Sequence, residues 1–163
     1  MKYEYIIYNT LIKIIISSSN WNILIPKIKY FLDIIFKQIF IKTSCCKKTC
    51  NIKYVSIHLS NNNSLKYLNY YFKNKNMSTN TLCFSFYLSK LNKINLKKIF
   101  LGEIIINYKN LILESLFLKI NFINYLSYII MHSILHLYKY NHINTIDIIT
   151  MQKIEKILLC MIN

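Results

Sequence analysis

The sequence contains no alanine and no arginine, and it has one glycine (Gly102), one proline (Pro26) and one valine (Val55). The abundant residues are Lys, Ile, Asn, Tyr and Phe, whose codons are rich in A and T, whereas the missing residues mostly need G or C. We attribute this bias to mutational drift in an A/T-rich genome. Such drift replaces arginine by lysine and small residues by serine or asparagine, so a residue at a site can differ from the type that its chemistry favours.

Long hydrophobic runs are also absent. No stretch reaches the roughly 18 uncharged apolar residues that a membrane-spanning helix needs. The N-terminal segment has some features of a signal peptide, but Glu4 and Lys13 interrupt it and no small-residue cleavage site follows. The sequence therefore predicts a cytoplasmic protein with no membrane span.

The cysteines lack the spacing of a disulfide framework. Their number is odd, and the segment 43–50 (TSCCKKTC) has no paired C-x2-C halves of a zinc ribbon. We interpret the cysteines as reduced thiols, which suits the cytoplasm, and the segment 43–50 as a loop. The five residues are Cys45, Cys46, Cys50, Cys83 and Cys160.

Acidic residues are few: 6 Asp and Glu stand against 21 Lys and Arg, which gives a formal net charge of +15. Such a charge attracts polyanions and would steer RNA onto the surface. Lysine-rich drift gives the same charge without any partner, so the charge permits an RNA partner but does not identify one. With 163 residues, of which 54% are hydrophobic, the chain fits a single domain, residues 1–163, with its own core.

Both strand and helix patterns occur along the chain, and their order favours an α+β fold with a small mixed sheet. Alternation or β-rich composition predicts one or two strands in 1–16 and further strands in 52–59, 81–88 and 99–108. Helical spacing predicts a helix from Pro26 onward and further helices in 61–76, 109–119, 121–137 and 147–161. His58 lies alone on a predicted strand, where a packing or surface role is expected.

Three of the four histidines fall within eleven residues. His132 and His136 are one helical turn apart, so their side chains share one face of a helix. His142 follows six residues later, which leaves enough chain to end the helix and turn back. Three protein ligands leave a tetrahedral ion one open position, the arrangement of catalytic rather than structural zinc. The spacing therefore predicts one divalent ion, Zn²⁺, per chain.

This spacing also suits zinc proteases, but they carry a glutamate directly after the first histidine as general base. Ser133 stands at that position here. The protease interpretation therefore loses its base.

The same segment resembles the H-G-x-L-H-L-x-G-Y-D-H signature of the YbeY-type endoribonucleases, which mature ribosomal RNA. Three further blocks follow the family order: residues 73–85 resemble R-x-K-D-x-P-T-N-V-L-S-F-P, residues 101–104 resemble L-G-D-I, and Met151 and Glu155 resemble a Met-x3-Glu pair. The resemblance is strongest over residues 51–161. The signature matches are His132, Leu135, His136, Leu137, Tyr140 and His142.

The resemblance implies a mixed sheet of about four strands with five or six helices, and a metal site on the late helices. It also implies a hydrolase, a zinc-dependent endoribonuclease that cuts single-stranded precursor ribosomal RNA, with the ribosome or its small subunit as a further partner and no DNA or membrane. In this interpretation water on the three-histidine zinc attacks a phosphodiester, Lys73 and Lys75 neutralise the developing charge, and Glu103 orients a ligand histidine. The lysine-rich segment 66–75 would contact phosphates, and its aromatic residues Tyr70, Tyr71 and Phe72 would either stack on bases or belong to the core.

The departures from the family pattern motivate a second hypothesis. The family arginine is Lys73, which lacks the bidentate fork, and the two signature glycines are Ser133 and Lys139. If the turn before His142 requires a positive φ, Lys139 costs about 1 kcal/mol. The chain would then be a ribosome-assembly factor that keeps the metal but cleaves weakly. A third hypothesis, a basic protein lying on membranes, predicts a helix with an exposed apolar face and lysines at its rim.

Overall fold

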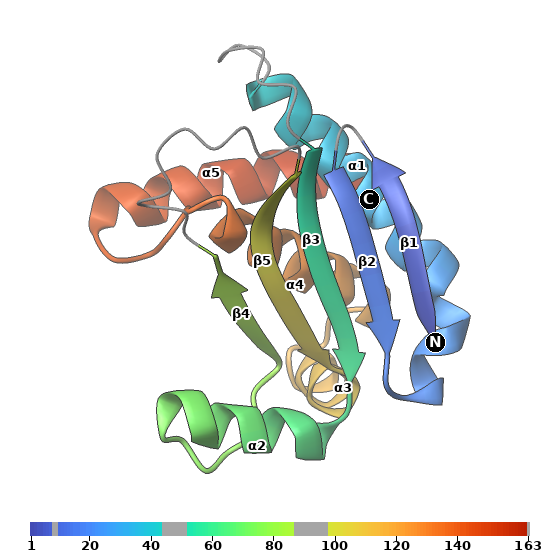
Figure 1. The fold of residues 1–163 in the computed structure, drawn as a ribbon. Coiled ribbons are helices and arrows are strands. Elements are labelled where there is room, and N and C mark those ends of the chain that lie inside the picture. The colour runs from blue at the N-terminus through green and yellow to red at the C-terminus, as the bar shows by residue number, and fades with distance from the viewer. Residues whose placement is uncertain (8–9, 44–51, 87–97, 163) are drawn as a thin grey trace.

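The computed structural model describes residues 1–7, 10–43, 52–86 and 98–162. These residues form one five-stranded sheet in the order β1-β2-β3-β5-β4, packed with helices (Figure 1). The α+β prediction is confirmed, with five strands where about four were expected, because residues 1–16 supply two of them. The strands are β1 (Lys2–Ile7), β2 (Thr10–Ile16), β3 (Ile52–Ser60), β4 (Thr81–Ser85) and β5 (Lys98–Asn107). The helices are the 3-10 helix η1 (Ser19–Leu24), α1 (Ile25–Thr43), α2 (Asn62–Lys73), α3 (Tyr108–Phe117), α4 (Phe122–Leu137) and α5 (Thr145–Ile162).

The sheet is mixed. Its three central strands, β2, β3 and β5, run parallel, whereas β1 and β4 pair antiparallel at the two edges. Strand alternation divides the side chains between two faces. Ile12 and Ile14 on β2 and Ile57 on β3 are fully buried on the face covered by α1, α4 and α5 (Figure 1). This face holds the main core.

The other face of the sheet is covered only in part. Leu65 of α2 packs there with Leu82 of β4 and Ile105 of β5 in a second, small core cluster. Asn61 caps α2 by accepting a hydrogen bond from the Ser64 backbone N–H at 3.1 Å, and Asn74 ends the helix with a φ of 54°. Because Leu65 contacts Leu82 and Ile105, the α2 helix lies beside the edge formed by β4 and β5.

Gly102 lies where β5 passes closely under its neighbours. Its φ is +145°, which side chains with a Cβ rarely adopt, and an added Cβ would lie 2.2 Å from the Phe84 carbonyl oxygen of β4 and 2.9 Å from the Leu137 side chain of α4. A register shift in the β3–β5 pairing lies beside it, between Tyr54 and Val55. The single glycine of the chain therefore permits the close packing of β4, β5 and the end of α4.

The described helices do not all bury their apolar side chains. The end of α3 and the following turn leave Leu113, Leu116, Phe117 and Ile120 exposed, with Lys119 among them. The membrane-surface hypothesis predicts such an exposed apolar face, and membrane binding itself stays a prediction. None of the helices in the described ranges is both long and apolar enough to cross a bilayer.

Candidate metal centre

The candidate centre is built on α4, the helix at the middle of the core. Asn121 begins α4 by accepting a hydrogen bond from the Ile123 backbone N–H at 2.9 Å. Ten of its side chains are buried, which fixes the rotation of the helix against the sheet. His132 and His136 lie one turn apart on the half-buried side. The packing of α4 thus presents two imidazoles at one place on the surface.

The third histidine returns to these two through the loop after α4. Tyr138 and Tyr140 bond back to carbonyls of Leu135 and its neighbours, and Lys139 between them has a φ of 69°. The turn before His142 therefore does require a positive φ, and a lysine occupies the left-handed position where the family signature has glycine. This turn carries the chain back, so that His142 reaches the end of α4.

The three predicted ligands converge. Ring centroids are 4.6 Å apart for His132 and His136, 4.7 Å for His136 and His142, and 5.0 Å for His132 and His142. One nitrogen from each ring lies within 4.8 Å of the nitrogens of the others. His132 and His136 are half-buried and His142 is exposed, which leaves one side of the group open to solvent.

The outer nitrogens of two rings are already committed. His136 Nδ1 lies 2.9 Å from the Tyr140 carbonyl oxygen, which only accepts, so Nδ1 carries the proton. His132 Nδ1 lies 2.7 Å from a carboxylate oxygen of Glu155, a pair in which the carboxylate accepts. In the neutral rings both Nε2 atoms are then lone-pair acceptors, and they face each other at 3.1 Å.

Two facing lone pairs repel unless a cation lies between them. Two nitrogens bound tetrahedrally at about 2.0–2.1 Å from one zinc ion would be about 3.3 Å apart, close to the observed separation. Burial, and then the neighbouring His132, lowers the pKa of His136, which favours the neutral ring that binds metal. The donor set therefore fits one divalent ion, and imidazole nitrogen is a ligand that zinc prefers.

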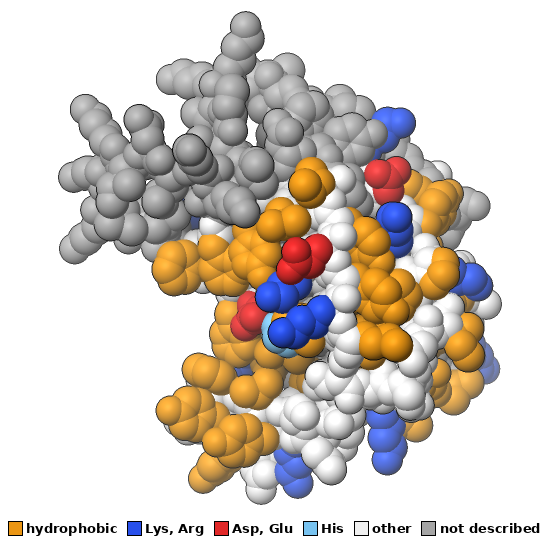
Figure 2. Space-filling model, turned by 45° about the vertical axis from the view of Figure 1, so that its right-hand side comes forward, with side chains coloured by type: hydrophobic (Ala, Val, Ile, Leu, Met, Phe, Trp, Pro, Cys, Tyr) orange, Lys and Arg blue, Asp and Glu red, His pale blue; other side chains and the backbone are white. Residues whose placement is uncertain are grey.

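Glu103, which the sequence placed behind a ligand histidine, lies on the other face of the sheet. Its carboxylate contacts His58 Nε2 at 2.8 Å, and Ser56 Oγ lies 3.1 Å from the same nitrogen. Figure 2 shows lysine and acidic side chains gathered together on this side of the molecule, with hydrophobic side chains around them. His58 is thus a partly exposed, paired histidine, in line with its expected role. Glu155 occupies the position that was expected for Glu103.

The two predicted catalytic lysines are both exposed near the end of α2. Burial raises the pKa of the Cys83 thiol, while hydrogen bonding with Ser133 and Thr81 and the charge of Lys73 act in the opposite direction. Ser133 directly follows His132. Cys83 packs against the main core and does not belong to the three-histidine group. The three cysteines of segment 43–50 lie outside the described residues.

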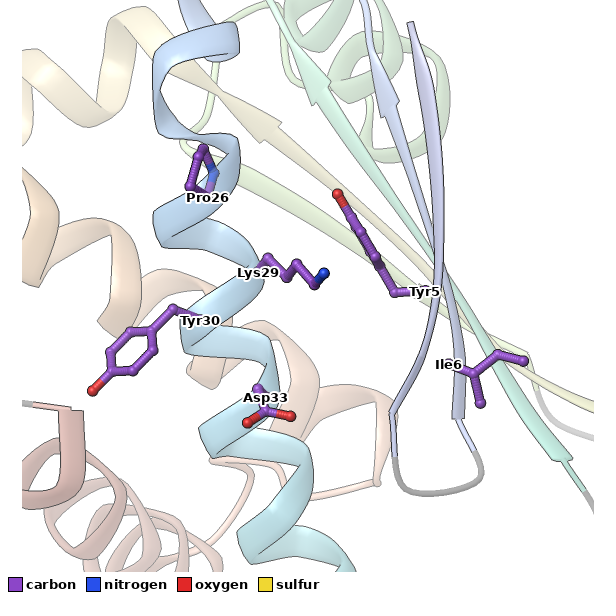
Figure 3. Close-up of a pocket in the computed structure, with 6 residues that line it drawn as sticks. All are labelled: Tyr5, Ile6, Pro26, Lys29, Tyr30 and Asp33. Carbon is purple, nitrogen blue, oxygen red and sulfur yellow. The ribbon is translucent and has the colours of Figure 1, made fainter.

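A surface pocket elsewhere contains none of the predicted site residues. It lies between β1 and α1, where Lys29 points toward Tyr5 and places its ammonium 4.7 Å from the ring centroid (Figure 3). Tyr30 points away from the strand in the same view. The pocket is a groove of mixed apolar and charged lining with a cation–π contact, and its side chains do not converge as those of the three histidines do.

Sequence reasoning gave Glu155 no role, although it noted the residue. In the structure, burial distinguishes this residue. Glu155 is 8% exposed and lies one turn after Met151, which is 1% exposed, on the inner side of α5. A carboxylate in such a position needs a partner. The Tyr140 carbonyl leaves no trace in the sequence, because every residue has one.

Fold and site together define an α+β domain with a candidate three-histidine metal site. Glu155 and the Tyr140 carbonyl oxygen hold two of the three rings in orientation. The family model for endoribonuclease YbeY matches residues 16–163. An endoribonuclease YbeY of Ehrlichia ruminantium (strain Welgevonden) is 34% identical over 145 residues, 89% of this chain and 87% of that protein. One of Ehrlichia chaffeensis is 38% identical, with the match covering 62% of either chain, and one of Buchnera aphidicola (from Acyrthosiphon pisum) is 34% identical over 85% of this chain and 83% of that protein.

The chain belongs to the endoribonuclease YbeY family. Its fold is also similar to the solution structure of TM1509 from Thermotoga maritima, with a TM-score of 0.61 over 93% of this chain and 88% of that chain at 19% identity. The resemblance stated from the sequence is thereby confirmed for family and fold.

Proposed function

We propose that the chain is a zinc-dependent endoribonuclease that cuts single-stranded RNA during ribosomal RNA maturation in the cytoplasm, with the ribosome or its small subunit as a further partner. The observation that carries the proposal is the pair of Nε2 atoms 3.1 Å apart whose rings are fixed from behind by Glu155 and Tyr140. The family, whose members are named endoribonucleases, supplies the substrate class. The proposal includes no DNA substrate and no membrane partner.

His132, His136 and His142 would hold the ion. When bound, such an ion supplies Lewis-acid chemistry toward water and phosphate. Glu155 keeps the proton of His132 on Nδ1, and the Tyr140 carbonyl does the same for His136, so both rings present lone pairs to the same point. His142, on the exposed side, leaves room for a phosphodiester to approach.

Lys73 and Lys75 would neutralise charge on the phosphate that reacts. Both are exposed near the end of α2, and Thr81 Oγ1 of β4, the strand that follows, lies 3.4 Å from Oγ of Ser133, the residue after His132. A lysine ammonium carries the charge but not the planar fork of an arginine. These residues would therefore stabilise developing charge without fixing the phosphate in two directions.

Cleavage of single-stranded RNA by the zinc-loaded chain tests this function. The parent protein and His136→Ala are compared at equal zinc, with cleavage followed on a denaturing gel. We expect the parent to cut and the variant to lose nearly all activity. Equal cleavage by both proteins would remove the metal centre from the mechanism.

Two departures favour a second candidate, an assembly factor that binds metal and ribosome but turns over poorly. Lys73 replaces the family arginine, and Lys139 holds a φ of 69° where the signature has glycine. This candidate predicts that Lys73→Arg increases the cleavage rate while zinc binding is unchanged. An unchanged rate would show that the lysine is not the cause of weak turnover.

A further inference from the structure

The exposed face of α2 is aromatic, which is unusual for the solvent side of a helix. Only Leu65 and Asn69 of α2 are buried. Four aromatic side chains on its outer side have exposed fractions between 57% and 68%. The alternative that these residues belong to the core therefore does not hold for the described structure. We call this set the α2 platform: Tyr67, Tyr70, Tyr71 and Phe72.

The rings of the platform form a connected series. Tyr67 and Tyr71 are nearly parallel, with an interplanar angle of 18° and centroids 6.3 Å apart, and Tyr71 meets Phe72 edge-on at 5.0 Å. Phe72 in turn lies 4.9 Å from Phe84 of β4, which packs against the small core cluster. The series is thus anchored at one end, so less side-chain entropy is lost when a flat ligand binds.

The segment of chain that carries the platform holds charge of one sign. Residues 61–86 contain three lysines, Lys66, Lys73 and Lys75, and no aspartate or glutamate. Aromatic faces beside lysines are how proteins bind single-stranded nucleic acid without reading its sequence, because every base has a face that stacks and every nucleotide a phosphate. The exposed patch at the end of α3 is mostly aliphatic, with one exposed aromatic ring, Phe117, and one lysine, Lys119.

The platform also leads toward the metal centre. Its Phe72 contacts Phe84 of β4, and Thr81 Oγ1 at the start of β4 lies 3.4 Å from Oγ of Ser133, the residue after His132. A strand of RNA lying on α2 would therefore continue along β4 toward the three histidines.

We propose that the α2 platform binds bases of single-stranded RNA next to the nucleotide at the metal centre, by stacking on Tyr67 and Tyr71. Lys66 contacts the phosphate between those bases, and Lys73, at the end of the platform, keeps its place at the phosphate that reacts. This rests on the proposed function for the identity of the strand as substrate, but the stacking itself does not require cleavage.

The test measures RNA binding apart from cleavage. A fluorescein-labelled single-stranded oligoribonucleotide is titrated with the full chain in the presence of a chelator, and anisotropy gives Kd. The double variant Tyr67→Leu/Tyr71→Leu keeps apolar bulk but removes the ring faces, and Tyr67→Phe/Tyr71→Phe restores them. Tyr30→Leu is the matched control, because Tyr30 on α1 is 57% exposed and also has lysine neighbours. Thermal unfolding checks that each variant folds.

We expect the Leu pair to raise Kd by about tenfold or more, since stacking contributes roughly 1–3 kcal/mol per base and each 1.4 kcal/mol is tenfold. The Phe pair should bind within about twofold of the parent, and Tyr30→Leu should bind like the parent. The dependence of Kd on salt should stay unchanged in the Leu pair and weaken in Lys66→Gln/Lys73→Gln, because only the lysines release counterions. An oligomer of the same length without bases should bind the parent and the Leu pair equally.

Unchanged binding of the RNA by the Leu pair would overturn the platform, and so would an equal loss for the oligomer without bases. Either result would leave cleavage by the His136 centre untouched. The converse result is that the parent binds RNA more tightly than the Leu pair and yet never cleaves it. That result would overturn the proposed function and support the platform.

Discussion

Among the described residues, two histidine–carboxylate pairs have nearly equal length, and one of them belongs to the three-histidine group. His132 lies 2.7 Å from Glu155 on the helical side of the sheet, and His58 lies 2.8 Å from Glu103 on the open side. In the first pair the carboxylate contacts Nδ1, which leaves Nε2 for two further imidazoles. In the second pair the carboxylate and Ser56 share Nε2, and the three-histidine group does not include this ring.

The difference shows that a short histidine–carboxylate contact is not by itself a site. Such a contact fixes the tautomer and the orientation of the imidazole ring. It supports a metal site when other ligand atoms lie close to the second ring nitrogen. Exposure separates the pairs as well: the Glu155 side chain is 11% exposed and the Glu103 side chain 40%. Water screens the outer pair, so it contributes little to stability.

Removing one histidine from each group gives the largest expected contrast. His142→Ala leaves two ligands, so we expect zinc affinity to fall by more than the roughly 100-fold that is the upper range for loss of a supporting residue. His58→Ala should bind one zinc ion as the parent does. Competition with a chromogenic zinc chelator measures both affinities and the stoichiometry. If His58→Ala lost the ion as well, the two pairs would belong to one centre.

Exchanging the two carboxylates for amides gives the next effect. Glu155→Gln keeps the shape but weakens the contact to His132 Nδ1, so we expect zinc affinity to fall by about 10–100-fold. Glu103→Gln should leave it unchanged, because its contact is with His58. The same chelator competition compares the variants. A fall in Glu103→Gln with none in Glu155→Gln would return the supporting role to Glu103, as the sequence first suggested.

The two pairs also show what the sequence could and could not reveal. The relation of His132 to His136 follows from helix geometry alone, and the strand and helix segments followed from short-range periodicity. The choice between Glu103 and Glu155 depends on which side of the sheet each element faces, a long-range property of packing. His132 and Glu155 are 23 residues apart, and no local pattern links them.

The same limit applies to the sheet and to α2. Residues 1–16 alternate too loosely for periodicity to separate one strand from two, and the pairing of Lys2 with Ile15 resolves them. The aromatic residues of α2 are of types that are often buried, and the placement of α2 beside the edge of the sheet leaves them exposed. Composition predicts what a residue prefers, whereas topology decides whether a neighbour is there to cover it.

The smallest expected effect concerns the turn that brings His142 to the centre. Lys139→Gly removes a side chain from a position with a φ of 69°, so we expect a gain of about 1 kcal/mol in the free energy of unfolding. Lys119→Gly is the matched control, because Lys119 has a φ of 55° in the turn after α3, remote in sequence from the histidines. Denaturant unfolding should show a similar gain for both, and only Lys139→Gly should alter zinc affinity, because only that turn positions His142. If both variants bound zinc with equal affinity, the conformation at Lys139 would not be what positions His142.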